Sequence, residues 1–492
     1  MTGPQSPALD SRPSAPDRFP LGTDGWRGVI ADGCTFDAIR RLAGAYASVY
    51  AALPEGDRRR VLVGHDTRFD SPEFARAAAE VFARAGLDVF LADRAIPTPA
   101  VSFHVRRLGL AGGIAITASH NPAPYNGFKI KAHFGGSASP ELYDEVARAL
   151  NSPFARGERP GRVETIDLTT PYRDHLATLL NVSAIRSAGL TVVSDAMHGA
   201  AGSLVADIAG GGPCRIIPFR AERDVLFGGV NPEPIGSNLA ATAEKTIAER
   251  ADLALATDGD ADRLGVLDGK GRFVSPHRVL ALLLRHAFRG RGLRGGIAKT
   301  FSTSFLIDRV GAALGSPVCE TAIGFKYVAD LMNRGEAVAG GEESGGYAFG
   351  FHLPERDGVL NALLLLESLA VAGQDLEGAL AELASEFGEL AYDRRDFYLP
   401  VAVIADFLRE VEAAPPETVA GYAVTEVKDK DGIKYLFGDS GWLLHRLSGT
   451  EPMIRLYCEH ADTESVQRIL DSASERLAAF GVAHGIEPHE DH

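Results

Sequence analysis

Three aspartates in the stretch TDGDADR, residues 257–263, could bind a metal ion. Asp258, Asp260 and Asp262 alternate with small residues directly after an apolar run, so a loop at the end of a strand can turn all three carboxylates toward one point. Carboxylates so close together repel one another unless a cation lies between them, and a set of hard oxygen ligands favours Mg²⁺. An EF-hand is excluded because Arg263 and Gly269 stand where that loop requires glycine and glutamate. A solvated polar turn is the alternative explanation.

A second stretch, AITASHNPAPYNGFKIK at residues 115–131, places a serine beside a histidine after an apolar run. Ser119 and His120 are not expected to form a hydrolase pair, because adjacent side chains on an extended segment point apart and the motif G-x-S-x-G is absent. The oxygen of Ser119 could instead carry a phosphoryl group that coordinates Mg²⁺, with Lys129 available to balance charge. A capped turn explains these residues equally well when they are taken alone.

The segment GGEESGG, residues 340–346, could hold a sugar by its hydroxyl groups. Glycines on both sides allow the backbone to approach a ligand closely. Glu342 and Ser344 would face the same way if the segment is extended, and a carboxylate with a hydroxyl is suited to hydrogen bonds with a sugar. A hairpin turn between the neighbouring apolar runs explains the segment almost as well.

The segment HRLSGTEPMIRLY, residues 445–457, has the composition of an anion-binding loop. Hydroxyl groups, backbone N–H groups around a glycine and guanidinium groups together form a nest suited to a phosphate dianion. The residues concerned are Arg446, Ser448, Gly449 and Thr450, with Arg455 beyond the loop. An ordinary polar hairpin is the alternative, and a metal site elsewhere in the chain shifts the balance toward phosphate.

The elements that must position these loops follow an α/β pattern. Short apolar runs rich in Val, Ile and Ala alternate with segments of helical period, which is typical of parallel or mixed sheets covered by helices. A helix is expected after residue 70, with Ser71 as its N-cap and Pro72 at its first position. The stretch GRGLRG, residues 290–295, satisfies G-x-G-x-x-G. It follows a helical pattern and precedes a strand, whereas in a dinucleotide-binding site the motif follows a strand and precedes a helix, so no such site is predicted. Strands are expected at residues 61–66, 113–117, 190–195, 253–258 and 296–300.

Length and composition limit the classes of function. A chain of 492 residues is too long for one hydrophobic core and should form several domains. The formal net charge of −15 and the absence of a Lys/Arg-rich run argue against nucleic acid and membrane surfaces as partners, and no apolar run approaches the ~18 residues of a membrane span. Four scattered cysteines indicate neither disulfides nor zinc, so a cytoplasmic location is expected. Residues 1–19 are expected to be a disordered leader and residues 486–492 a tail.

Four motifs in this order, TASHNPAPYNGFKI, DGDADR, GEESGG and RLSGTEP, resemble those of the α-D-phosphohexomutases, a family of phosphoglucomutases, phosphomannomutases and phosphoglucosamine mutases. The stretch GTDGWRG, residues 22–28, is similar to the N-terminal signature of that family. The resemblance implies three related α/β domains with mixed sheets and a smaller α+β C-terminal domain, arranged around a central active-site cleft. The domains are expected at residues 20–160, 161–268, 269–387 and 388–485.

The resemblance also implies a role for each motif. Ser119 would be the phosphoserine, and its phosphate would bind Mg²⁺ together with the three aspartates. Glu342 and Ser344 would hold sugar hydroxyls. Arg446, Ser448, Gly449 and Thr450 would bind the phosphate that does not react. The remaining expected site residues would contact the transferring phosphoryl group, supply an acid or base, or point into the cleft. They are Arg27, His120, Lys129, Arg263, Lys299, Lys326 and Arg455.

The implied activity is the interconversion of hexose 1-phosphate and hexose 6-phosphate, with hexose 1,6-bisphosphate as intermediate and activator. Glucose phosphates are favoured and mannose phosphates come next, because GEES and the loop AIGFKY, residues 322–327, are more similar to glucose-phosphate mutases than to the phosphoglucosamine branch. Gly346 stands where many phosphomannomutase-type members have histidine, which puts a ligand contact there in doubt. A Mg²⁺-dependent sugar-phosphate phosphatase and a phosphoglucosamine mutase are the alternatives. Sugar phosphates are the expected partners of a monomer or homodimer.

Overall fold

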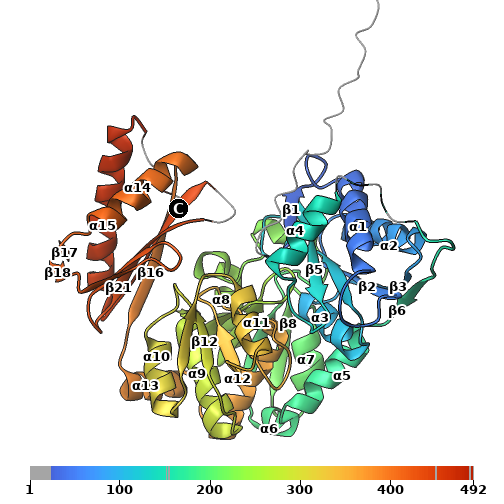
Figure 1. Ribbon diagram of the computed structural model, residues 1–492. Helices are drawn as coiled ribbons and strands as arrows, with labels where there is room; N and C mark the ends of the chain where they lie inside the picture. The colour runs from blue at the N-terminus through green and yellow to red at the C-terminus, as the bar shows by residue number, and fades with distance from the viewer. Residues whose placement is uncertain are drawn as a thin grey trace, which may run out of the picture.

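The computed structural model describes residues 24–150, 152, 154, 156–448, 452–486 and 489–490. They form four units, each built on its own sheet, which we number domains I to IV in chain order (Figure 1). The predicted α/β class, with a smaller α+β domain at the C-terminal end, is confirmed. Among the described residues no single helix is long and apolar enough to cross a membrane, and one pair of helices, α12 and α13, reaches that length and composition only together, across a bend of 83°.

Domain I carries a mixed sheet of order β1-β5-β4-β2-β3-β6. The strands β4, β2, β3 and β6 are parallel to one another, β5 is antiparallel to β4, and β1, at the edge of the sheet, is antiparallel to β5. The last strand, β6, follows residue 160, the end expected for this domain. The elements are β1 (Trp26–Val29), α1 (Phe36–Tyr50), β2 (Arg60–His65), α2 (Ser71–Arg84), β3 (Asp88–Ala92), α3 (Thr98–Arg107), β4 (Gly112–Ile116), β5 (Tyr125–Ala132), α4 (Pro140–Ala149) and β6 (Val163–Ile166).

Domain II carries a five-stranded sheet of order β11-β10-β9-β7-β8. Strands β9 and β10 are antiparallel neighbours, so the loop that joins them leaves the sheet at the end of β9. The elements are α5 (Thr169–Leu179), α6 (Val182–Ser187), β7 (Thr191–Asp195), α7 (Leu204–Ala209), β8 (Arg215–Phe219), η1 (Phe227–Gly229), η2 (Gly236–Asn238), α8 (Ala240–Glu249), β9 (Leu253–Thr257), β10 (Leu264–Asp268) and β11 (Phe273–Val274).

Domain III carries a four-stranded sheet of order β13-β12-β14-β15, in which β14 and β15 form a hairpin. Helix α12 is apolar on all sides and packs against α6, α7, α9 and β10, so it joins the cores of domains II and III. The elements are α9 (Pro276–Arg285), η3 (His286–Gly290), β12 (Ile297–Thr300), α10 (Leu306–Leu314), β13 (Val318–Thr321), α11 (Phe325–Asn333), β14 (Ala339–Gly341), β15 (Tyr347–Phe349), α12 (Gly358–Ala372) and α13 (Leu376–Phe387).

Domain IV carries an antiparallel sheet of order β19-β20-β21-β22-β16-β23. Helices α14 and α15 cover one face, and in Figure 1 the domain stands beside domain III, joined to it where β16 follows α13. On the other face Trp442, Leu444 and Tyr457 pack against Phe301 of domain III. The elements are β16 (Ala391–Tyr398), α14 (Val401–Ala413), β17 (Thr418–Val419), β18 (Tyr422–Ala423), β19 (Glu426–Lys428), β20 (Ile433–Leu436), β21 (Trp442–Leu447), β22 (Met453–His460), α15 (Thr463–Ala483) and β23 (His489–Glu490).

The five predicted strands correspond to β2, β4, β7, β9 and β12. The predicted N-cap of α2 is wrong by one residue. The cap is Asp70, with a φ of 57°, and Ser71 is the first helical residue. The Ser71 hydroxyl does not cap the helix because it donates to Asp66 Oδ1 at 2.6 Å.

Candidate active site

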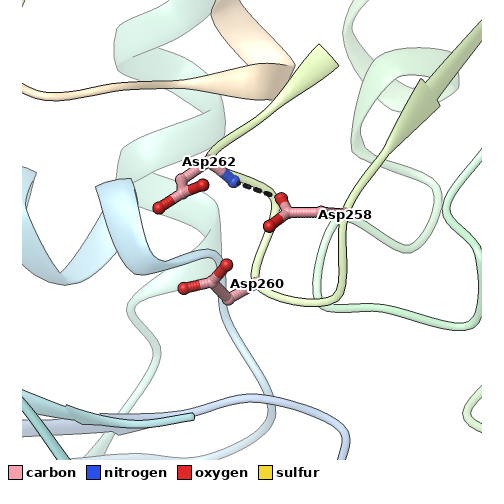
Figure 2. A group of neighbouring side chains, drawn as sticks. All are labelled: Asp258, Asp260 and Asp262. Atoms are coloured by element: carbon pink, nitrogen blue, oxygen red, sulfur yellow. Dashed lines mark hydrogen bonds between the residues drawn. The ribbon is translucent and has the colours of Figure 1, made fainter. Parts of the chain in front are cut away.

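The loop between β9 and β10 brings the three aspartates together. Asp258, Asp260 and Asp262 are fully buried, and each offers a carboxylate oxygen within 4.8 Å of those of the other two. Asp258 Oδ1 accepts a hydrogen bond from the backbone N–H of Asp262 at 2.8 Å (Figure 2). It accepts a second from the backbone N–H of Arg263 at 3.0 Å, and the two bonds close the loop. The sequence prediction that a turn after this strand gathers the carboxylates is confirmed.

Two oxygens in this cluster have no hydrogen-bond partner among the described residues. Asp260 Oδ1 and Asp262 Oδ1 are buried and unpartnered, whereas the other oxygen of each carboxylate accepts hydrogen bonds. Burial and the charges of Asp262 and Asp260 raise the pKa of Asp258 well above its usual value. Unpaired buried oxygens beside a third carboxylate are the donor set that a small divalent cation requires, so these residues fit Mg²⁺.

Ser119 faces this cluster from the loop between β4 and β5. Its Oγ donates a hydrogen bond to Asp258 Oδ2 at 3.0 Å, and the side chain is buried. The prediction that Ser119 and His120 point apart is wrong: Ser119 Oγ lies 3.3 Å from His120 Nδ1. The prediction assumed extended backbone, but Ser119 has a φ of 54°, which turns both side chains to the same side.

The unusual conformation of Ser119 is held by Arg68, a residue that we did not single out in the sequence. Arg68 is fully buried and pairs with Asp66 at 3.1 Å. Its guanidinium donates to the carbonyl oxygens of Ser119 and Asn121, each at 2.6 Å, and of Pro122 at 2.9 Å. Several donors in one rigid fork fix the loop, and therefore the position of the Ser119 hydroxyl.

Cationic and acidic side chains surround His120. Arg263 donates to Glu233 Oε1 at 2.9 Å, and His120 Nε2 lies 3.9 Å from the same oxygen. Arg27, on β1, donates to Asn121 Oδ1 at 2.5 Å. Burial, followed by the charges of Arg263 and Arg27, lowers the pKa of His120 well below its usual value, so its imidazole is neutral at pH 7.

Lys129, on β5, connects domains I and II. Its Nζ lies 2.9 Å from Asp260 Oδ2, 3.4 Å from Asp262 Oδ2 and 2.8 Å from Asp24 Oδ2. Burial alone would lower the pKa of Lys129, but the three carboxylates raise it above its ordinary value. The ammonium group therefore stays charged and offsets part of the negative charge of the aspartate loop.

The β14–β15 hairpin brings Glu342 to the same region. The segment is a turn and not extended, because Glu342 N–H donates to the Gly346 carbonyl at 3.0 Å. Glu342 is buried and accepts from Arg356 Nη1 at 3.3 Å, while Ser344 is half-buried in the turn. Burial raises the pKa of Glu342 to about 7, although Arg356 acts to lower it.

The predicted phosphate loop lies between β21 and β22 of domain IV. Arg446 and Arg455 are opposite each other on these strands. Arg446 Nε donates to Asp431 Oδ1 at 3.0 Å, and Arg455 Nε lies 3.6 Å from Asp396 Oδ2. The backbone N–H of Ser448 donates to the Met453 carbonyl at 2.8 Å. Gly449 and Thr450 lie outside the described residues.

Comparison with known proteins identifies the family. Models of the phosphoglucomutase/phosphomannomutase family match in chain order: alpha/beta/alpha domain I at residues 19–156, domain II at 170–271, domain III at 275–387 and the C-terminal domain at 407–476. The chain belongs to the phosphoglucomutase/phosphomannomutase family. Its members are isomerases that transfer a phosphoryl group within a sugar phosphate, and the predicted recognition is confirmed.

Relatives within this family carry different names. The chain is 30% identical to the phosphoglucomutase/phosphomannomutase of Thermococcus kodakarensis, over 92% of this chain and 96% of that protein. It is 32% identical to the phosphoglucosamine mutase of Rhodococcus jostii, over 93% and 99%. A crystal structure from Thermus thermophilus, provisionally named a phosphomannomutase, superposes with a TM-score of 0.82 at 38% identity, over 93% of this chain and 98% of that one.

The family motifs of domains I, II and III meet around the aspartate loop, but not every predicted residue takes part. Lys299 Nζ pairs with Asp308 and donates to the Ser304 carbonyl at 3.3 Å, so it turns toward the start of α10. Lys326 lies with its Nζ 5.0 Å from the centre of the Tyr327 ring. Neither lysine makes a direct contact with Ser119 or the aspartates among the interactions of the described residues.

Besides Arg68, two further charged residues of the site were missed in the sequence. Asp24 and Arg356 both contact the aspartate loop or its lysine, and Arg356 Nη2 donates to Asp24 at 2.9 Å across 332 positions of sequence. The stretch GTDGWRG contains Asp24, but Arg27 was the one residue of that signature predicted to lie in the site. No local pattern marks Arg356, whose partners come from three different domains.

Proposed function

We propose that the chain interconverts hexose 1-phosphate and hexose 6-phosphate through phosphoserine 119 and a hexose 1,6-bisphosphate, with glucose phosphates preferred and mannose phosphates next. The observation that carries the proposal is the hydrogen bond of 3.0 Å from Ser119 Oγ to Asp258, at a cluster with two unpartnered carboxylate oxygens. A serine oxygen next to a cation site is suited to carry a phosphoryl group.

In the first transfer, the bond between Ser119 Oγ and phosphorus breaks while phosphorus bonds to the free hydroxyl oxygen of the sugar phosphate. The proton of that hydroxyl passes to a base. The bisphosphate then turns over in the site, and its other phosphoryl group returns to Ser119 by the reverse step. The two transfers leave the protein unchanged and the phosphate on a different carbon of the sugar.

His120 has the properties of that base. Its Nδ1 lies 3.3 Å from Ser119 Oγ, and burial with the neighbouring cations lowers its pKa, which keeps the imidazole unprotonated but also makes it a weaker base. A neutral imidazole is able to accept the proton of a hydroxyl that approaches the serine phosphate. Arg27, Lys129 and Arg263 lie close enough to stabilise the negative charge of the transferring group.

Asp258, Asp260, Asp262 and phosphoserine 119 would hold Mg²⁺. When bound, Mg²⁺ neutralises charge on the transferring phosphoryl oxygens. Lys129 and Arg356 each hold the second oxygen of an aspartate of this set, which leaves Asp260 Oδ1 and Asp262 Oδ1 for the metal.

The remaining predicted residues would bind the sugar phosphate on the other side of the reacting group. Glu342 and Ser344 would hold the sugar hydroxyls, and the guanidinium groups on β21 and β22 favour a phosphate dianion between domains III and IV. The residues assigned to the phosphate that does not react are Arg446, Ser448, Gly449, Thr450 and Arg455, with Lys299 and Lys326 assigned to the cleft.

The identity of the sugar is tested by kinetics. Glucose 1-phosphate, mannose 1-phosphate and glucosamine 1-phosphate are compared as substrates, each primed with its matching bisphosphate. We expect kcat/KM to be highest for glucose 1-phosphate. A higher value for glucosamine 1-phosphate would replace the proposal by the second candidate, which the name of the Rhodococcus jostii relative favours. Release of free phosphate without isomerised sugar phosphate would indicate a phosphatase instead.

A further inference from the structure

Arg356 connects the loops of three domains through one guanidinium group. It precedes Asp357, the N-cap of α12, and its side chain is buried. Nη2 donates to Asp262 Oδ2 of domain II at 2.6 Å and to Asp24 Oδ2 of domain I at 2.9 Å. Nη1 donates to Glu342 Oε2 of domain III at 3.3 Å. We call the loop between β9 and β10 the metal loop and the turn between β14 and β15 the sugar loop. A single cation therefore holds Asp262 of the metal loop, Glu342 of the sugar loop and Asp24 of the N-terminal signature.

The contacts of Arg356 depend on the planar fork of arginine. The guanidinium lies 5.4 Å from the centre of the Phe325 ring, and three carboxylates approach it in different directions. A lysine offers one nitrogen at this point, so it cannot hold Asp262 and Glu342 through separate nitrogens. The geometry of the two loops is consequently fixed by the shape of the side chain as well as by its charge.

Gly346, at the end of the sugar loop, leaves the space that Arg356 fills. A Cβ atom at position 346 would lie 2.2 Å from Cδ and 2.9 Å from Cγ of Arg356. All three nearest atoms belong to the Arg356 side chain, and the backbone of Gly346 is not in the left-handed region. Glycine is thus required here for the room it leaves and not for its conformation.

We propose that Arg356 is a positioning residue for both the metal loop and the sugar loop, and that Gly346 is glycine in order to admit it. The proposal rests on the proposed function. By holding Asp262 Oδ2, Arg356 directs the unpartnered Oδ1 into the aspartate cluster. By holding Glu342 Oε2, it sets the orientation of the carboxylate assigned to the sugar. Partners of this kind, one step away from a metal ligand, determine metal affinity.

The first test replaces the guanidinium. Mg²⁺ affinity is measured by calorimetry on the full chain without sugar, so that the result does not depend on mutase activity. We expect Arg356→Met to weaken Mg²⁺ binding by about 10-fold to 100-fold and to raise KM for the sugar phosphate, with Arg356→Lys in between. Unchanged Mg²⁺ affinity and KM in Arg356→Met would overturn the proposal. Arg291→Met, which removes a half-buried arginine near Glu367, is the control and should leave both values unchanged.

The second test displaces Arg356 without removing its charge. In Gly346→Ala the new methyl group pushes the Arg356 side chain away, so we expect the same direction of change in Mg²⁺ affinity and KM as in Arg356→Met. In the Arg356→Met background the alanine should cause no further change in Mg²⁺ affinity or KM, because the guanidinium group that it would displace is already absent. Equal effects of Gly346→Ala in both backgrounds would contradict the role assigned to glycine. Gly33→Ala, whose nearest neighbour lies at 3.7 Å, is the matched control.

The two tests separate this proposal from the proposed function. If the chain does not isomerise sugar phosphates but the Mg²⁺ affinities change as described, the proposed function fails and the metal-loop role of Arg356 stands. If isomerisation is found and the Arg356 and Gly346 variants bind Mg²⁺ and sugar phosphate like the unmodified chain, only the present proposal fails.

Discussion

At the scale of single residues, the site is a cluster of buried charges whose balance is incomplete in the protein alone. Lys129 and Arg356 pair with some of the carboxylate oxygens, but Asp260 Oδ1 and Asp262 Oδ1 are left without partners. The high pKa of Asp258 has the same origin, because burial and two like charges disfavour its ionised form. A cation bound between these carboxylates would therefore stabilise the fold.

A prediction at this scale concerns Asp258→Asn. The amide keeps the shape of the side chain and carries no group that must ionise or take up a proton beside Asp260 and Asp262, so the free energy of unfolding without metal should rise at pH 7. The increase in Tm on adding Mg²⁺, expected for the unmodified chain, should be lost. Thermal melts in EDTA and in Mg²⁺ measure both effects. Asp174→Asn, at an exposed position, serves as control. A Mg²⁺-dependent increase in the Tm of Asp258→Asn would refute the assignment of Asp258 as a metal ligand.

Residue types and spacing predicted the part of the site that is local in sequence. Asp258, Asp260 and Asp262 share one turn, so their convergence could be inferred from one short motif. Asp24 and Arg356 could not be found in this way, because their contacts join segments that are distant in the chain. The pairing of Ser119 with His120 was mispredicted because a positive φ at a non-glycine residue has no signal in the neighbouring sequence.

At the scale of elements, the strands and helices were predictable from apolar period, whereas the turns that carry the chemistry were less so. The strands on either side of residues 342–346 follow from the apolar runs, but the sequence left open whether the segment between them is extended or forms the hairpin turn that is found. A similar turn in domain IV, between β19 and β20, carries Asp431. This residue links two loops: Oδ1 accepts from Arg446 Nε at 3.0 Å, and Oδ2 accepts from the backbone N–H of Ile323 at 2.7 Å.

We predict that Asp431→Ala weakens substrate binding more than it slows turnover. Without the carboxylate, Arg446 loses a charge-assisted hydrogen bond, and residues 322–327 of domain III lose the hydrogen bond from the Ile323 backbone N–H to domain IV. One such bond corresponds to about 1–3 kcal/mol, so KM for the hexose phosphate should rise by about 10-fold with a smaller change in kcat. Steady-state kinetics would show this. Asp429→Ala changes an exposed aspartate of the same turn, and an equal rise in KM for this variant would count against the assignment.

At the scale of the whole molecule, domains I to III share a core, and domain IV attaches to domain III through a smaller and partly polar contact (Figure 1). Lys434 is at the centre of this contact. It is buried, its Nζ donates to the Phe301 carbonyl at 2.6 Å, and it lies 4.2 Å from the centre of the Trp442 ring. Burial lowers the pKa of Lys434 to about 8. The four-domain arrangement was foreseen through the family resemblance, whereas an ammonium group buried between domains was not.

The pH dependence of stability should report this lysine. The pKa of Lys434 is about 8 in the folded protein against 10.5 for the free side chain, so the unfolded chain binds more protons between these pH values. The free energy of unfolding should therefore rise with pH from about 8 to 10.5, by up to about 3 kcal/mol relative to Lys434→Met. Denaturant unfolding at several pH values measures the difference. Lys428→Met, which changes a half-buried lysine whose side chain is 40% exposed, should show the same pH dependence as the unmodified chain. If Lys434 were solvated, Lys434→Met would show that pH dependence too.

The central claim is that Ser119 carries the phosphoryl group that is transferred. The most direct measurement is mass spectrometry of the protein after incubation with glucose 1,6-bisphosphate and Mg²⁺, followed by peptide mapping and a chase with hexose 1-phosphate. We expect one phosphoryl group on Ser119, its loss on the chase with formation of the bisphosphate, and none of this in Ser119→Ala. A phosphoryl group on another residue, or isomerisation at an unchanged rate by Ser119→Ala, would contradict the account.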